Sequence, residues 1–326
     1  MTAKIVGVGG FVPSGISNNH YLASITDTSD DKVVQRAGIK ERRILGEGLA
    51  TSDMIVLAVE DLLSKSDVGI KDIDCLIVAT CTPDMPMPST ATIVCRKLKV
   101  ENVFSFDLNS TYSGFIYALR VAASLVESER FKNIIVAGAD TMSKVTNLDN
   151  CNTNILFGDG AGVVLLQPCS SGIGLLDSII EGKGESKEYM NIEGGVSLNP
   201  LSYEVLADKK NFIKQNGKII FKNAVEKMTE VCEMILKKNN VIPDQIDWFV
   251  PHQANHRIIT AVGNNLKLDS KKVLKNVEKF GNTTSASIPL CLWEFQIQLK
   301  RGDLVLLSAF GAGFTWCAAL IEWAYN

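Results

Sequence analysis

Residues 62–80, LLSKSDVGIKDIDCLIVAT, predict the end of a helix, a short polar loop and a buried strand. Residues 235–250, ILKKNNVIPDQIDWFV, align with this stretch without a gap and follow the same pattern. Both segments have Ile-Asp directly before the apolar run. A second match joins FKNIIVAGAD at 131–140 to KRGDLVLLSAF at 300–310, in the same order and at a similar separation. We interpret the two matches as a duplicated α/β unit.

Short apolar runs alternate with longer helical patterns along the chain, which is typical of a parallel sheet covered on both faces. We expect strands at Ile5–Val8, Cys75–Thr80, Phe104–Leu108, Asn133–Gly138, Gly162–Leu166, Asp247–Val250, Leu304–Ala309 and Thr315–Glu322. We expect helices at Ser52–Lys65, Thr90–Leu98, Gly114–Ser128, Asn223–Lys238, Asn255–Leu266 and Ile288–Leu299, with Ser52 and Asp53 or Asn255 as N-caps.

The predicted domain organisation follows from the repeat and from one change in amino-acid composition along the chain. The length of 326 residues fits one large α/β domain or two fused halves. Residues 181–217 are rich in Gly, Glu, Lys and Asn and show little periodicity, so we interpret them as a surface cover over the junction. We therefore predict an N-terminal half at 1–170, a connection or cap at 171–222 and a C-terminal half at 223–326.

Composition narrows the class of protein. Hydrophobic residues make up 46% and charged residues 21%, which excludes a disordered chain. Lys+Arg number 33 against 36 Asp+Glu, which argues against a nucleic-acid binder. Eight scattered cysteines without a C-x-x-C pair argue against a zinc site and predict reduced thiols in a cytoplasmic protein. Residues 304–323 are long and apolar enough to span a membrane, but Gly311 and Gly313 favour two buried strands instead.

Polar residues follow several predicted strands, where α/β folds collect ligands. His252 lies in such a turn beside a predicted helix N-terminus, which favours a neutral imidazole. The other two histidines, His20 and His256, are expected to be structural. Asn282, in the turn GNTTSAS at 281–287, would donate a hydrogen bond to an anion, although such turns are common. The glycine run at 158–162 precedes a strand rather than opening a helix, which excludes a dinucleotide fingerprint.

Two further loops could face a reacting group. Residues 106–115, FDLNSTYSGF, lead from a strand into a helix in the arrangement of a nucleophile elbow, with Tyr112 at its apex. Gly311 and Gly313 lie between the last two predicted strands, where bare backbone N–H groups could face a reacting oxygen or simply form a turn.

Together these segments resemble β-ketoacyl-acyl-carrier-protein synthase III of the thiolase superfamily, from Ile5 nearly to the C-terminus at Trp323. The matching motifs are DTSD at 27–30, RAGI at 36–39, FGDGA at 157–161, VPHQAN at 250–255, GNT at 281–283 and AFGAGFTW at 309–316. The resemblance implies a five-layered αβαβα fold with two duplicated halves. It also implies a homodimer in which the strand at Phe104–Leu108 pairs across the two-fold axis.

The resemblance further implies chemistry on acyl or malonyl thioesters of coenzyme A or acyl carrier protein, with no other cofactor. In the family a cysteine takes up the acyl group, and a His and an Asn, here His252 and Asn282, support decarboxylation of the malonyl carrier. The N–H of Ala312 matches half of the oxyanion hole, and Met87 matches a loop that reaches the partner's acyl pocket.

The position of the family's cysteine is Tyr112. A phenol has a pKa of about 10, so it is a poor nucleophile at neutral pH, and its large ring is expected to fill the acyl pocket. The flanking hydroxyls of Ser110, Thr111 and Ser113 are weaker candidates, because neighbours on a turn point elsewhere.

The expected mouth for coenzyme A also departs from the family. Arg36 and Arg257 match residues that hold phosphates or a carrier protein. Lys32 stands where the family has an adenine-stacking Trp, and Cys151 stands where it has an Arg. The resemblance also places Thr28 and Asn255 among the substrate-binding residues.

Three hypotheses remain open from the sequence. The first is an enzyme that acts on acyl or malonyl thioesters without a cysteine acyl-enzyme. The second is a catalytically inactive partner subunit that pairs with a complete paralogue. The third is the ordinary condensing enzyme of fatty-acid initiation, which would require Tyr112 to be tolerated. In each case the expected partners are acyl carrier protein, acyl-CoA or a second subunit, with no nucleic acid and no membrane.

Overall fold

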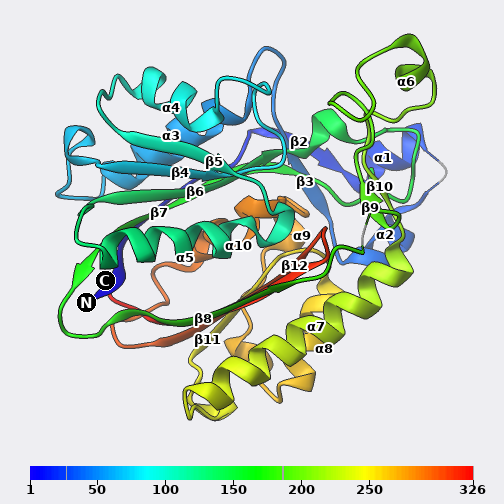
Figure 1. Ribbon diagram of the computed structural model, residues 1–326. Helices are drawn as coiled ribbons and strands as arrows, with labels where there is room; N and C mark the ends of the chain where they lie inside the picture. Colours follow the sequence, from blue (N-terminus) through cyan, green and yellow to red (C-terminus); the bar gives the residue numbers. More distant parts are fainter. Residues whose placement is uncertain (27, 186, 326) are drawn as a thin grey trace.

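Two mixed β-sheets form the framework of the protein (Figure 1). The structure is a computed structural model that describes residues 1–26, 28–185 and 187–325. The first sheet has the order β1 (Thr2–Phe11), β7 (Asp159–Cys169), β6 (Ile134–Thr141), β4 (Cys75–Ala79) and β5 (Phe104–Leu108). The second sheet has the order β11 (Trp248–Pro251), β12 (Leu304–Gly311), β13 (Thr315–Glu322) and β8 (Gly174–Gly182).

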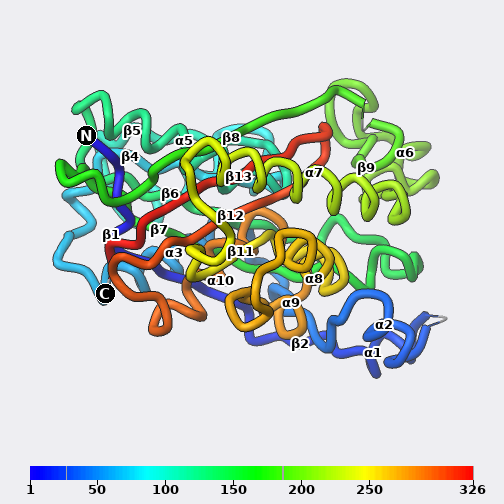
Figure 2. Tube along the Cα trace, turned by 90° about the horizontal axis from the view of Figure 1, so that it is seen from below, coloured from blue at the N-terminus to red at the C-terminus, as the bar shows by residue number. Residues whose placement is uncertain are grey.

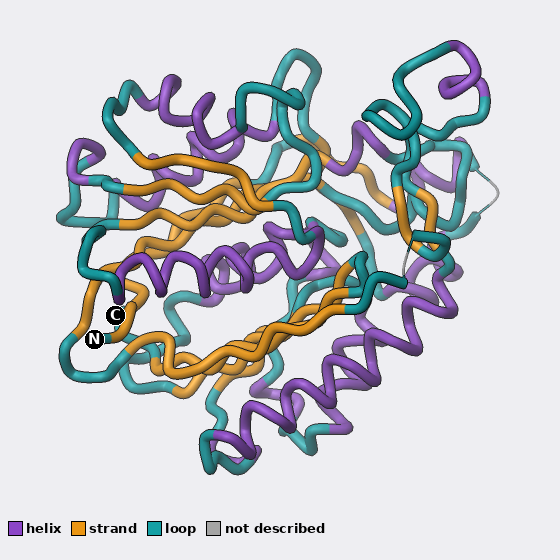
Figure 3. The backbone as a smooth tube through the Cα atoms, in the orientation of Figure 1, coloured by secondary structure: helices purple, strands orange, loops and turns teal. Residues whose placement is uncertain are grey.

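Helices form three layers around these sheets, as the alternation of purple and orange in Figure 3 shows. The outer face of the first sheet is covered by α3 (Thr51–Leu63) and α4 (Thr90–Leu98). Between the two sheets lie α5 (Gly114–Glu127) and α10 (Ser287–Phe295). The outer face of the second sheet is covered by α7 (Gly217–Lys238) and α8 (His256–Asn265). The five-layered αβαβα fold predicted from the resemblance is therefore confirmed.

Smaller elements gather at one end of the molecule, on the side away from both termini (Figure 2). They are β2 (Gly15–Asn18), β3 (Glu41–Ile44), α1 (Asn19–Ile25), α2 (Asp30–Ala37), β9 (Met190–Asn191), α6 (Tyr203–Ala207) and β10 (Lys214–Gln215). Asp27, the first residue of the motif at 27–30, lies outside the described residues.

The duplication predicted from the two sequence matches is visible in the strand pairing. In the first sheet β4 runs parallel to β6, and β7 and β1 follow antiparallel to their neighbours. In the second sheet β11 runs parallel to β12, and β13 and β8 follow in the same antiparallel sense. The matched segments thus become β4 with β11 and β6 with β12, while β5 adds an edge to the first sheet.

The expectation of a purely parallel sheet is wrong. The five-residue span from Gly311 to Thr315 turns β12 directly into β13, and so short a connection can join only antiparallel strands. This hairpin confirms the two-strand interpretation of residues 304–323. Across the described residues no helix is long and apolar enough to cross a membrane. The stretch 171–222 supplies β8 and the start of α7 as well as covering elements, and its role as a separate connection remains a prediction.

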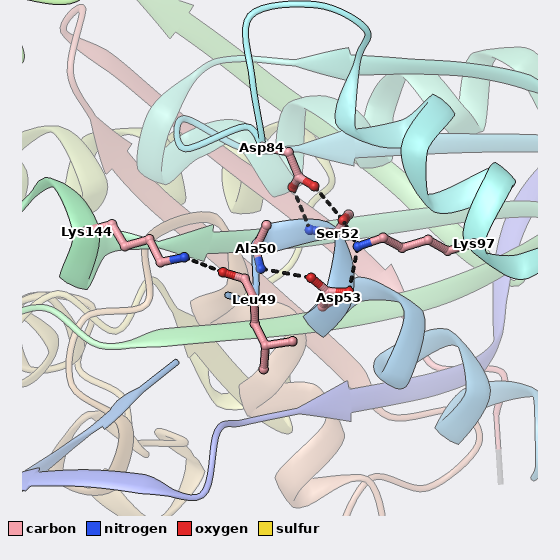
Figure 4. A network of polar contacts seen from close by, with 7 residues as sticks. All are labelled: Leu49, Ala50, Ser52, Asp53, Asp84, Lys97 and Lys144. Carbon is pink, nitrogen blue, oxygen red and sulfur yellow. Dashed lines mark hydrogen bonds and ion pairs between the residues drawn. The ribbon is translucent and has the colours of Figure 1, made fainter. Parts of the chain in front are cut away.

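The N-terminus of α3 corrects one predicted N-cap. The N-cap residue is Ala50, and Ser52 lies inside the helix. The Asp84 carboxylate accepts hydrogen bonds from Ser52 N (2.9 Å) and Ser52 Oγ (2.6 Å), so a neighbouring loop caps the helix (Figure 4). Asp53 accepts from Ala50 N (2.8 Å) and pairs with Lys97 of α4. The predicted N-cap at Asn255 of α8 is confirmed.

Asp84→Ala is expected to lower the free energy of unfolding by about 1–2 kcal/mol, because two donors and the positive end of α3 lose their carboxylate. Urea unfolding followed by circular dichroism measures this change. Asp149→Ala removes an exposed carboxylate that pairs with Lys209 and should cost less than about 0.5 kcal/mol. Equal losses in the two variants would contradict a capping role for Asp84.

Candidate functional site

The site forms where four chain segments meet at the ends of strands. These segments are η2 (Thr111–Ser113) after β5, the residue after β11, the loop that contains η6 (Thr284–Ala286), and the turn between β12 and β13. Close packing holds them together. A Cβ added to Gly138 of β6 would lie 2.2 Å from the Ser285 carbonyl oxygen, so only glycine lets the η6 loop approach the first sheet.

Tyr112 occupies the apex of the predicted elbow and is 7% exposed. Its ring stacks on the His252 imidazole, with ring centroids 5.1 Å apart and planes inclined by 12°. Met142, Met190 and Ile213 belong to the same apolar cluster. Burial, with smaller contributions from Cys81 and Asp140, raises the pKa of Tyr112 well above its ordinary value. The phenol is therefore neutral at physiological pH and is not a nucleophile of the phenolate type.

His252 is buried, and its two ring nitrogens differ. Nδ1 lies 2.6 Å from Ser287 Oγ, whereas Nε2 is buried and has no hydrogen-bonding partner among the described residues. Desolvation lowers the pKa of His252 to about 3, so the imidazole is neutral. A buried polar atom without a hydrogen-bonding partner costs about 1–3 kcal/mol of stability. A catalytic role is one of the explanations for such an atom in a native structure.

The buried neutral imidazole predicts a pH dependence of stability. The pKa of His252 in the folded protein lies below the ordinary value of 6.5, so below pH 6.5 the unfolded chain binds a proton that the folded chain does not. The wild-type protein should therefore lose about 2 kcal/mol more than His252→Gln when urea unfolding is compared at pH 7 and pH 5. Equal losses in the two proteins would show that the imidazole is protonated in the folded state.

Asn282 is held with its amide in one orientation. Its backbone N–H donates to Leu156 O (2.9 Å), and its backbone carbonyl accepts from Gly158 N (3.1 Å). Its side-chain Oδ1 accepts from Thr284 N (3.0 Å), which leaves the Nδ2 amino group as the donating end of the side chain. His252 and Asn282 both line one cavity.

The fully buried Asp140, at the end of β6, ties two loops of the site together. One carboxylate oxygen accepts hydrogen bonds from the segment that follows β4, and the other accepts from η6. The donors are the hydroxyls of Thr80, Thr82 and Thr284 and the amides of Cys81, Thr82 and Ser285. Asp140 thus sets the position of the loop that carries Asn282.

Two cavities meet at Tyr112. The first has a volume of about 890 Å³ and contains His252, Asn282 and the cationic side chains of Arg36, Lys214, Lys218 and Arg257. The second, of about 620 Å³, is lined by apolar side chains of Met142, Val145, Ile192 and Ile213 together with Cys81 and Ala312. Tyr112 and Met190 line both cavities, so the Tyr112 ring forms part of the wall between them.

The backbone N–H of Ala312, predicted as half of an oxyanion hole, donates to the hydroxyl of Thr111 (2.9 Å). Ala312 and Thr111 lie in the second cavity rather than beside His252 in the first. Of the other two hydroxyls near the apex, Ser113 is buried and accepts from Thr315 Oγ1 (3.1 Å). Ser110 lines neither of the two cavities, in the part of the chain that the structure describes.

The structure brings together some of the predicted substrate-binding residues and leaves others outside. Arg36, Asn255 and Arg257 line the first cavity, and Asn255 Nδ2 donates to Arg36 O (3.0 Å), which joins α8 to α2. Arg257 also lies over the Phe221 ring, 5.2 Å from its centroid. Four predicted substrate-binding residues do not belong to the described lining of either cavity: Thr28, Lys32, Met87 and Cys151.

Sequence reasoning did not single out several residues that the site contains. Ser287 is the buried partner of His252, and Asp140 holds the loop that carries Asn282. Lys214 and Lys218 add positive charge to the lining of the first cavity. Lys214 and Lys218 lie in the stretch 171–222 that we predicted as a connection or cap, where a cluster of lysines near Asn216 was the available signal.

Comparison with known proteins gives a consistent result. The family described as 3-oxoacyl-[acyl-carrier-protein (ACP)] synthase III matches residues 106–184, and its C-terminal part matches residues 236–323. The chain is 43% identical over 326 residues to the β-ketoacyl-[acyl-carrier-protein] synthase III of Azobacteroides pseudotrichonymphae, which covers 99% of this chain and 98% of the relative. The synthase III 2 of Bacteroides thetaiotaomicron is 43% identical and covers 100% and 98%.

A solved structure agrees with these sequence relatives. The crystal structure of 3-oxoacyl-[acyl-carrier-protein] synthase III from Aquifex aeolicus is similar with a TM-score of 0.92 and 36% identity. It covers 98% of this chain and 100% of the relative. The similarity therefore includes every segment that builds the site.

Proposed function

Because the chain belongs to the β-ketoacyl-acyl-carrier-protein synthase III family, we propose that it acts on acyl or malonyl thioesters of coenzyme A or acyl carrier protein without a cysteine acyl-enzyme. The observation that carries the proposal is the pair of His252, with its unpaired neutral Nε2, and Asn282, with its donating Nδ2, in one cavity beside a residue that cannot serve as the nucleophile.

Decarboxylation of a malonyl thioester is the reaction that this pair suits best. The bond between the carboxylate carbon and Cα breaks, carbon dioxide leaves, and the electron pair moves toward the thioester oxygen to give an enolate. With Ser287 donating to Nδ1, the His252 Nε2–H and the Asn282 Nδ2 can both donate to that oxygen. Cα then takes a proton from water, and the product is an acetyl thioester.

Tyr112 must move for this reaction, because its ring lies against the face of the His252 ring. The second cavity offers space beside it, and a stacked aromatic pair contributes only about 0.5–1.5 kcal/mol. The proposal therefore includes a rotation of Tyr112 away from His252 when the substrate enters.

The charges at the first cavity suit a phosphate-bearing thioester. Arg36, Lys214, Lys218 and Arg257 face one acidic residue, Glu188, in the lining. Such a cluster can hold the phosphates of coenzyme A, the phosphopantetheine of a carrier protein or the acidic surface of that protein. The side chains at the positions of the adenine-stacking pair, Lys32 and Cys151, lie outside the lining, which favours a carrier-bound substrate.

A homodimer through β5 is part of the proposal. β5 is the edge of the first sheet, and Phe104 on it is 50% exposed while it stacks on Phe131, with centroids 5.6 Å apart. Met87 is 81% exposed on the loop whose residues Met85 and Pro86 line the second cavity. The unpaired N–H and C=O groups of an edge strand are a template for pairing with another chain, and Phe104 adds exposed apolar surface to this edge.

The alternative, an inactive partner of a complete paralogue, is supported by the blocked site. Tyr112 covers His252, and the Ala312 N–H is already hydrogen bonded. This alternative would predict a heterodimer and no turnover by the purified chain.

The experiment is turnover of malonyl and acyl thioesters of coenzyme A and of acyl carrier protein by the purified protein, with intact-mass spectrometry of the protein during turnover. We expect carbon dioxide and an acetyl thioester from the malonyl substrates, and no acyl adduct on the protein. An adduct during steady state would contradict the thiol-free route. No turnover of any substrate, with a heterodimer in native mass spectrometry of material from the producing cells, would favour the inactive partner.

A further inference from the structure

Thr111 lies between the elbow and the turn that joins β12 to β13. Its Oγ1 accepts a hydrogen bond from the Ala312 N–H (2.9 Å), and its carbonyl accepts one from Ser285 Oγ (3.0 Å). A Cβ added to Gly311 would lie 2.6 Å from Thr111 Oγ1, so the hydroxyl also lies close to the turn. The hydroxyl of Thr111 thus links the elbow to a turn that lies 201 residues away in the sequence.

The backbone of Thr111 indicates that this position is imposed by its surroundings. Its φ is 46°, in the left-handed region, which a β-branched residue rarely adopts. The hydrogen bonds at both its hydroxyl and its carbonyl offset that strain, so the hydroxyl has one defined place.

Two kinds of thioester chemistry place different demands on these groups. Acyl transfer to a nucleophile passes through a tetrahedral oxyanion, and one N–H donor to that oxyanion raises the rate by about 10²–10³. Decarboxylation passes through an enolate, for which His252 and Asn282 are the donors in the function proposed above. The hydroxyl of Thr111 occupies the Ala312 N–H and leaves His252 and Asn282 untouched.

We infer that Thr111 is a specificity-determining residue, whose hydroxyl occupies the Ala312 N–H and disfavours acyl transfer, so that the site selects β-carboxy thioesters over simple acyl thioesters. The selection of β-carboxy thioesters rests on the proposed function. The occupation of the N–H and its effect on acyl transfer do not depend on it.

The test restores a nucleophile and then removes the hydroxyl. Tyr112→Cys, Thr111→Ala/Tyr112→Cys and Thr111→Ser/Tyr112→Cys are incubated with acetyl-CoA, and intact-mass spectrometry follows formation of the cysteine thioester. The sulfur attacks the acyl carbon, the C–S bond to coenzyme A breaks, and the coenzyme A thiol leaves. We expect the Thr111→Ala double variant to acylate about 10–100-fold faster than Tyr112→Cys. The Thr111→Ser double variant should match Tyr112→Cys, because serine keeps the acceptor.

The inference would be overturned if the Thr111→Ala double variant acylated no faster than Tyr112→Cys, or if serine accelerated acylation as much as alanine. If the wild-type protein released no carbon dioxide from malonyl thioesters, only the proposed function would be contradicted. The acylation comparison does not use that reaction.

A second measurement keeps Tyr112 in place, in case the cysteine variants do not fold. Amide hydrogen exchange at Ala312 in the full chain should be about 10-fold faster in Thr111→Ala than in wild type, and unchanged in Thr111→Ser. Unchanged exchange in Thr111→Ala would show that the hydroxyl does not hold this amide and would overturn the inference.

Discussion

His252→Ala is expected to lower carbon dioxide release from a malonyl thioester by about 10²–10³-fold. The imidazole Nε2 lines the first cavity, is buried and has no hydrogen-bonding partner among the residues that the structure describes. One preorganised donor to a developing oxyanion has an effect of this size. Burial keeps the ring neutral, with the pKa of His252 lowered to about 3, so the rate should not change between pH 5 and pH 8 through this group. The measurement is the initial rate of release with saturating substrate.

His256→Ala is the matched control, because His256 is an exposed histidine four residues away on α8. We expect its rate within about threefold of wild type. A His252→Ala rate as high as that of His256→Ala would contradict the role of the imidazole, provided that both variants have wild-type thermal unfolding.

Asp140→Ala is expected to lower the free energy of unfolding by about 3–5 kcal/mol. The fully buried carboxylate accepts from three hydroxyls and three amides, which come from two loops. Each buried donor left without a partner costs about 1–3 kcal/mol, and rotation of the hydroxyls toward other acceptors recovers part of this sum. Guanidinium unfolding measures the change.

Asp208→Ala removes an exposed carboxylate that pairs with Lys210 and should cost far less than Asp140→Ala. Asp140→Asn keeps one acceptor oxygen and should fall between wild type and Asp140→Ala. If Asp140→Ala cost no more than Asp208→Ala, the carboxylate would not be the link between the two loops.

The positions of the strands were predictable because buried strands are short apolar runs, and eight expected strands have counterparts in the structure. The antiparallel direction of β13 against β12 was not predictable, because a glycine-rich segment between two strands can form a hairpin or simply end the first strand. β8 was missed because Gly174–Gly182 mixes apolar with polar residues and runs along the sheet edge with five half-buried positions.

The site was predictable as a set of loops but not as a set of contacts. Tyr112, His252 and Asn282 follow strands, and ends of strands converge in this class of fold. The stacking of Tyr112 on His252 depends on a side-chain rotamer that the sequence does not specify. The hydrogen bond from Ala312 to Thr111 joins residues 201 positions apart, and no local pattern encodes such a pair.

The central claim is that the reaction needs no nucleophile at position 112, and its most direct test is carbon dioxide release by Tyr112→Phe, compared with wild type and His252→Ala. Phenylalanine keeps the ring but lacks the hydroxyl, so we expect a rate within about threefold of wild type, since the raised pKa of Tyr112 keeps the phenol out of the reaction. A loss as large as that in His252→Ala would contradict the account, because it would show that the Tyr112 hydroxyl takes part in the chemistry.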